Sequence, residues 1–350
     1  METLGLLSVR ALLASACAVM AGGVARGAEP ASETGPTEVR ARDVEFRRID
    51  PDTGSISMAV SAARASASGE SAVLETIRLV RYSPGGAPVL EASATGGRVL
   101  QGGSVALDGA VAVRWCGQKV KASFRSGPAL WDNQKLVLSS EGPVRGTLAP
   151  GAGRPGEGGV AAFGLDIEGT GLEVTPERDR GRILSDVSAV MTGPARGPWR
   201  VTCDGGLEFS GLAGASPTLG FAGSVGVEGR GATIRADRAE VSLREIVDAR
   251  EDEGDRAVAI SRAWFVGTVC ARVDGARDLP WAEGPVEMRA ESAKIVPGGP
   301  DARATLTGTE SDAARVIMPN GVLRGMRIEI APGAVRTDGG ARSELEWRGE

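Results

Sequence analysis

Hydrophobic residues along this chain mostly alternate with polar or small residues. One seven-residue phrase shows the pattern best: residues 107–113 read LDGAVAV, residues 221–227 read FAGSVGV and residues 265–271 read FVGTVCA. Each copy has a large apolar residue, a glycine two positions later, and small or branched apolar residues two and four positions after the glycine. Such alternation is typical of a strand with one buried and one solvated face. The pattern predicts many short strands and little helix.

A second phrase follows the first at a fixed distance. Gly109 precedes Ala122 by thirteen residues, and Gly223 precedes Ala236 by the same number. Within the second phrase the alternation slips by one position, because Ala236 is followed by Ala239 on the apolar side. A three-residue step inside an alternating strand indicates a bulge or bend, and a glycine inside a strand indicates a bend or a close backbone approach. The chain therefore reads as a series of strand, turn and bent-strand units.

The shared apolar face of these strands is the candidate functional surface. Repeating units that each bury one face are not stable singly, so we expect them to stack around a continuous interior as a sandwich, jelly roll or solenoid. The residues that we expect to face this interior and form an apolar groove are Leu107, Val111, Val113, Phe221, Val225, Val227, Ile234, Phe265, Val269 and Ala271.

The N-terminal segment has the organisation of an export signal. A short head ends at Arg10, an apolar run covers residues 11–25, and small residues follow before Glu29. We interpret residues 1–28 as a signal peptide or short anchor. A weaker alternative makes Cys17 a lipidated residue. The sequence therefore predicts an envelope protein, either free or tethered to the inner membrane through an uncleaved N-terminus.

Composition excludes several functions. The chain has 350 residues and no histidine, which rules out histidine-based triads and imidazole zinc sites. Its net charge of −5 and only four lysines argue against nucleic-acid binding. We expect no catalytic residue, no metal and no cofactor.

Past the N-terminal segment three cysteines remain, Cys116, Cys203 and Cys270. For Cys116 and Cys203 a buried thiol is a better interpretation than a disulfide.

The repeated G-x-V strand followed by RADRAEV or RAESAKI resembles the OstA-like domain of the periplasmic lipopolysaccharide-export proteins, the LptA family and its relatives. This likeness covers residues 196–345. Residues 37–195 resemble LptC, through VEFRRIDPDTGSISMAVSAARA, the hairpin in VRYSPGGAPVLEASATGGRVL and the late strands with short E-x-x-G phrases. A Pro- and Gly-rich stretch at 191–199 marks the expected domain boundary.

The resemblance implies an all-β fold of tandem V-shaped β jelly-roll domains built from antiparallel strands. It also implies a non-enzymatic carrier or bridge component in the periplasm that holds the acyl chains of lipopolysaccharide (lipid A) in an apolar groove. Partners would be other lipopolysaccharide-export proteins, joined by strand-edge addition, or a second copy through self-association.

Two other functions stay open from the sequence. A structural β-solenoid or adhesin-like envelope protein would have a closed, packed interior. A β-helical carbohydrate enzyme is disfavoured by the missing histidine and by only thirteen aromatic residues, because sugar clefts usually need stacking rings.

Overall fold

The structure is a computed structural model of the 350-residue chain. It describes residues 39–347, apart from 69–70, 101–102, 117–119, 151–163, 193–197, 213–215, 230, 248–255, 275–283, 298–301, 320, 332–333 and 339–344. The expected signal segment at residues 1–28 lies outside the described residues. In the described part of the chain, no helix has the length and apolar character needed to cross a membrane.

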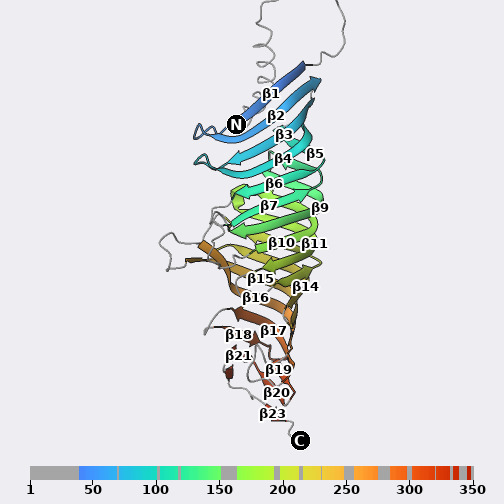
Figure 1. Ribbon diagram of the computed structural model, residues 1–350. Coiled ribbons are helices and arrows are strands. Elements are labelled where there is room, and N and C mark those ends of the chain that lie inside the picture. Colours follow the sequence, from blue (N-terminus) through green and yellow to red (C-terminus); the bar gives the residue numbers. More distant parts are fainter. Residues whose placement is uncertain are drawn as a thin grey trace, which may run out of the picture. The chain divides into compact units, whose positions relative to one another are not determined.

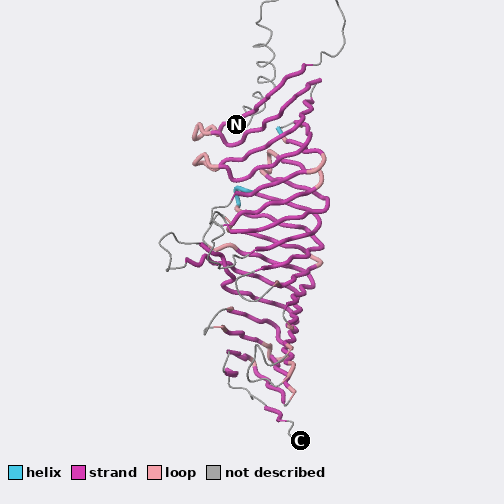
Figure 2. The backbone as a smooth tube through the Cα atoms, viewed as in Figure 1, coloured by secondary structure: helices cyan, strands magenta, loops and turns pink. Residues whose placement is uncertain are grey.

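The described residues are almost entirely antiparallel β-structure, which confirms the all-β expectation (Figures 1 and 2). The segment η2 (Pro176–Arg178) is a short 3-10 turn. The first nine strands are β1 (Val39–Ile49), β2 (Ile56–Ser68), β3 (Ser71–Tyr82), β4 (Pro88–Val99), β5 (Val105–Asp108), β6 (Val111–Cys116), β7 (Val120–Ser126), β8 (Ala129–Asp132) and β9 (Val137–Pro150).

The remaining strands follow in chain order and are mostly joined by short connections. They are β10 (Gly164–Thr175), β11 (Arg180–Thr192), β12 (Trp199–Cys203), β13 (Gly206–Ser210), β14 (Thr218–Gly229), β15 (Ala232–Val247), β16 (Arg256–Val273), β17 (Val286–Val296), β18 (Arg303–Thr307), β19 (Ala314–Met318), β20 (Gly321–Gly325), β21 (Arg327–Ala331), β22 (Ala334–Asp338) and β23 (Leu345–Trp347).

The chain divides into two compact units. Unit 1 contains the described residues up to 113 together with 126–140, and unit 2 contains 114–125 together with the described residues from 141 onward. The boundary expected at 191–199 falls inside unit 2, where β11 pairs with β12 from Val187↔Cys203 to Met191↔Trp199. The assignment of 37–195 and 196–345 as separate domains therefore stays a prediction that this division does not reproduce.

In unit 2 the long strands bend at one level. The register between β14 and β15 shifts between Ala222 and Val225, and the register between β16 and β17 shifts between Val266 and Val269. Figure 1 shows β14, β15, β16 and β17 following one another as neighbours. Each strand thus contributes one segment on either side of the bend, as the slipped alternation predicts.

We name these two parts by their residues. The phenylalanine segment contains residues 218–222 of β14, 238–243 of β15, 259–266 of β16 and 292–296 of β17, and continues through β18, β21 and β22. The valine segment contains residues 225–229, 232–236, 269–273 and 286–290 of the same strands, and continues through β19, β20 and β23.

The repeated glycines make the bend. Gly223 has φ 72° and Gly267 has φ 76°, a region that side-chain-bearing residues rarely adopt. A Cβ at Gly223 would lie 2.8 Å from the backbone nitrogen of Gly205 and against the carboxylate of Asp204. At Gly267 it would collide with the side chain of Asp237. In β14 and β16 the phrase places a residue without a side chain at the one point where a side chain would collide with the neighbouring strand or loop.

Candidate functional site

Three of the residues expected to face the interior belong to unit 1. Leu107 lies on β5, opposite Gly97 of β4 and Ala129 of β8, and Val111 and Val113 lie on β6. All three are buried, with exposed fractions of 1% or less. They share the unit with other large buried side chains, which are Leu74, Ile77, Leu79, Leu90, Trp131 and Leu138. The alternation predicted their burial, and their contact with a lipid stays a prediction.

In the phenylalanine segment of unit 2, large and small side chains alternate from strand to strand. Phe221 of β14 faces Ala239 of β15, which faces Phe265 of β16, which in turn faces Ala293 of β17. All four are buried. Because each ring lies beside an alanine, neighbouring rings have room to pack without strain. This part of the inner face is a packed surface.

The valine segment is more accessible at its inner row. Val225 and Val269, next to the bend, are buried. One pleat further from the bend, Val227, Ile234, Ala271 and Met288 lie in direct register across β14–β17.

Accessibility peaks in the middle of this row. Val227 and Met288 are 9% and 8% exposed, whereas Ile234 and Ala271 between them are half-buried. Apolar side chains therefore reach solvent on the inner side of the two central strands.

A similar row occurs in the phenylalanine segment, away from the bend. Ala263, Ile295 and Ala304 face one another across β16, β17 and β18, and all three are half-buried. The two ends of this row are buried, because Leu219, Val241 and Ile330 continue it on β14, β15 and β21. In the valine segment Val286, which lies further from the bend than Met288, is buried as well. The accessible apolar surface of unit 2 therefore lies in the middle of each row, on β15–β18.

Elsewhere in unit 2 aromatic rings fill the interior. The ring centroid of Phe209 on β13 lies 5.6 Å from that of Trp115 on β6 and 5.4 Å from that of Phe124 on β7. All three rings are buried. A Cβ at Gly181 of β11 would meet both Phe209 and Trp115, so glycine is needed beneath the rings. Sequence reasoning did not find this cluster, because Phe209 on β13 is distant in the chain from the rings on β6 and β7.

Other residues of the inner face were also missed. Met288 completes the accessible row, and its position opposite Ala271 follows only from the strand register. In unit 1 the buried Arg81 lies opposite Met58 and Leu90 and donates a 2.6 Å hydrogen bond to the backbone carbonyl of Ser57. The hydrogen bond compensates the burial of the Arg81 guanidinium. Because alternation predicts apolar residues on a buried face, it could not indicate a buried arginine.

The three described cysteines are not joined in disulfides, and their settings differ. Cys203 is buried, as expected, and burial raises the pKa of its thiol. Cys116 is half-buried, so the expectation of a buried thiol is wrong for this residue, which is the last of β6. Cys270 is exposed on β16. Among the described residues no group of three or more Cys, Asp or Glu side chains is placed to hold a metal ion.

Two strand edges bear on assembly. In the described pairing β1 bonds only to β2, and β22 bonds only to β21. The segment around Ile330, which alternates as an edge strand would, is β21; it pairs with both β18 and β22, and Ile330 is buried. At this end of unit 2 β22 is therefore a free edge, as is β23, which pairs only with β20 in the described strands.

No known protein-family model matches this chain, and no curated protein is significantly similar to it.

Proposed function

We propose that this protein is a non-enzymatic carrier that holds the acyl chains of an amphiphile against the inner face of unit 2. Following the resemblance noted in the sequence, the proposed cargo is lipopolysaccharide, and the proposed place is the periplasm. In this proposal each unit is a V-shaped β jelly-roll that encloses a groove.

The observation that carries the proposal is the half-buried apolar row. Ile234 and Ala271 expose aliphatic surface on the side of the strands that elsewhere forms the core. Exposed apolar surface of this kind costs free energy unless something covers it. Each methylene group that an acyl chain buries there contributes roughly 0.8 kcal/mol, so binding needs no chemical step.

The aromatic cluster favours a second candidate, a structural β protein. Trp115, Phe124 and Phe209 leave no room for an alkyl chain where they pack. In a structural protein the accessible row would be a rim of the core rather than a binding surface. The proposed acyl site is accordingly restricted to β14–β18.

Binding of an environment-sensitive fluorescent fatty acid to the full chain tests the proposal. Ile234→Asp puts a carboxylate into the row, and because Ile234 is half-buried the fold tolerates it. Thr233→Asp places the same charge on the exposed, opposite face of β15 and is the matched control. We expect Ile234→Asp to weaken binding at least tenfold and Thr233→Asp to leave it unchanged.

Circular dichroism of both variants checks that the strands remain. No binding by the unchanged protein, or equal binding by the two variants, would remove the acyl site and leave the structural candidate.

The free strand edges supply the proposed partner surface. An unpaired edge can add a strand from another chain through backbone hydrogen bonds. We propose that β1 and β22 each accept such a strand, from export proteins of the same pathway or from a second copy. Photocrosslinkers at Val44 on β1 and Arg336 on β22 should then capture a partner in intact cells. A monomer that captures nothing at either position would contradict this.

A further inference from the structure

The outer face of the valine segment carries an unusual row of arginines. Strand register sets Arg235 of β15 opposite Cys270 of β16, and Cys270 opposite Arg289 of β17. The row continues directly from Arg289 to Arg315 of β19 and from Arg315 to Arg324 of β20. Three arginines thus occupy three neighbouring strands, which lie about 5 Å apart.

This row differs from the outer face nearer η2. There Arg182 of β11 lies between Glu173 of β10 and Glu208 of β13, and it bonds to Glu173 at 2.7 Å. Opposite charges in register stabilise a sheet, whereas like charges directly opposite one another destabilise it. The succession of Arg289, Arg315 and Arg324 therefore costs stability in the unliganded protein.

Local carboxylates compensate the row only in part. Asp312 pairs with Arg315 at 3.0 Å, and Glu287 approaches Arg289 at 3.9 Å. Arg324 makes no hydrogen bond or ion pair with another described residue. The Nε atom of Arg315 is buried and has no hydrogen-bond acceptor, although a guanidinium donor in that position normally has one. The cations and the unused donor point to an absent anionic acceptor.

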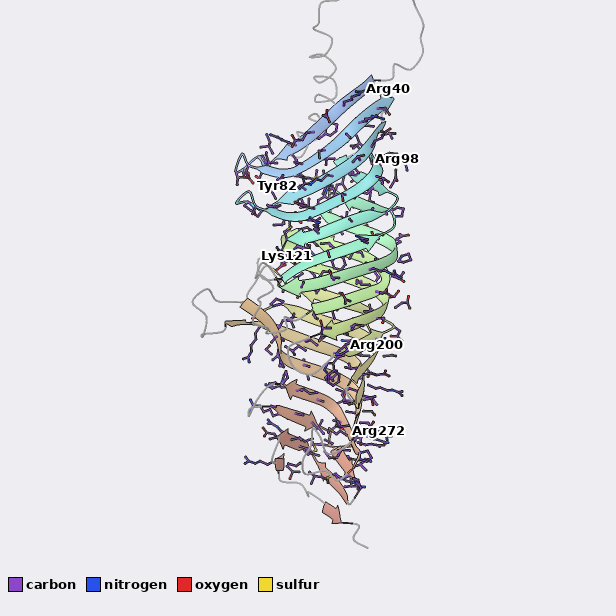
Figure 3. All side chains as sticks on the ribbon, in the orientation of Figure 1. Arg40, Tyr82, Arg98, Lys121, Arg200 and Arg272 are labelled. Carbon is purple, nitrogen blue, oxygen red and sulfur yellow. The ribbon has the colours of Figure 1, made fainter. Side chains whose placement is uncertain are left out.

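A shallow hollow of about 250 Å³ adjoins the row. It is lined by the inner row Val227, Ile234, Ala271 and Met288 and by the residues on either side of that row, which include Arg235, Arg272 and Arg289. The side chain of Arg272 lies along the same side of unit 2 as that of Arg200 (Figure 3).

We propose that Arg289, Arg315 and Arg324 form a binding site for a phosphate group. A phosphate dianion presents several strong acceptor oxygens and can bridge guanidinium groups on adjacent strands. It would supply the acceptor that Arg315 Nε lacks and neutralise the repulsion across β17, β19 and β20. The site lies on the face opposite the acyl row, and it does not depend on the acyl-binding proposal. The phosphate belongs either to a soluble anion or to a lipid headgroup.

Two titrations of the full chain distinguish these sources. One uses inorganic pyrophosphate with calorimetric detection, and the other uses cosedimentation with phosphatidylcholine vesicles that contain phosphatidic acid. Arg315→Gln removes the central cation, and Arg182→Gln removes an exposed arginine that is fully paired. We expect Arg315→Gln to weaken binding tenfold or more, as for a charge-assisted hydrogen bond, and Arg182→Gln to leave it unchanged.

Binding of pyrophosphate assigns a soluble anion, and binding of vesicles alone assigns a lipid phosphate; either result supports the site. Absence of binding in both titrations, or equal weakening by the two variants, would overturn it.

Thermal unfolding in phosphate-free buffer provides a second measurement. Arg289→Gln relieves repulsion, so the variant should be at least as stable as the unchanged protein. A clear loss of stability would show that Arg289 has a structural role instead.

Discussion

Replacing Gly223 by alanine tests the structural account of the repeated phrase. Gly223 has φ 72°, and a Cβ there would lie 2.8 Å from the backbone nitrogen of Gly205. The left-handed conformation costs an alanine about 1–2 kcal/mol. Pushing backbone apart in a packed region costs about 1–3 kcal/mol more. Gly223→Ala should therefore lower the free energy of unfolding of unit 2 by about 2–5 kcal/mol.

Gly220 in the same strand is the matched control. Its φ is not positive, and the nearest atom to a Cβ there is Glu208 Cβ at 4.0 Å. Gly220→Ala should raise stability by about 0.5–1 kcal/mol, because alanine loses less conformational entropy on folding. Urea unfolding followed by circular dichroism gives both values, with an unchanged m-value expected. Hydrogen exchange of peptides from β14 and β15 assigns the change to unit 2. Equal effects at the two positions would refute the reasoning.

Three further predictions concern single residues of unit 2. Thr268 has φ 40°, so Thr268→Gly should stabilise the protein by about 1 kcal/mol in urea unfolding, and a loss of stability would contradict the strain. Phe209→Ala should cost about 3–5 kcal/mol because it removes the central ring of the aromatic cluster; a change below about 1 kcal/mol would show that the cluster is loosely packed. A thiol reagent should modify exposed Cys270 within minutes in the native protein and leave Cys203 unmodified until unfolding, since burial raises the pKa of the Cys203 thiol; equal labelling of the two by mass spectrometry would be the contrary result.

The bends could be predicted from sequence because they leave a local signature. A glycine such as Gly223 and a three-residue step such as Ala236 to Ala239 are visible without knowing which strands pair. The burial of Phe221 and Val225 followed from alternation for the same reason.

Features that depend on register could not be predicted. The contact between Trp115 and Phe209 and the row from Arg289 to Arg324 join residues of strands whose pairing the pattern does not specify. Which strand forms the edge near Ile330 could not be predicted, because an alternating strand looks the same at an edge as inside a sheet.

Mass spectrometry of the lipids that remain bound to the protein tests the central claim most directly. The protein would be purified from its own envelope without detergent exchange, and its extract compared with that of the Ile234→Asp variant prepared in the same way. The account predicts an acylated, phosphate-bearing amphiphile in near-stoichiometric amount with the unchanged protein and its loss from the variant. A folded protein that carries no lipid, or a lipid retained equally by both, would contradict the account.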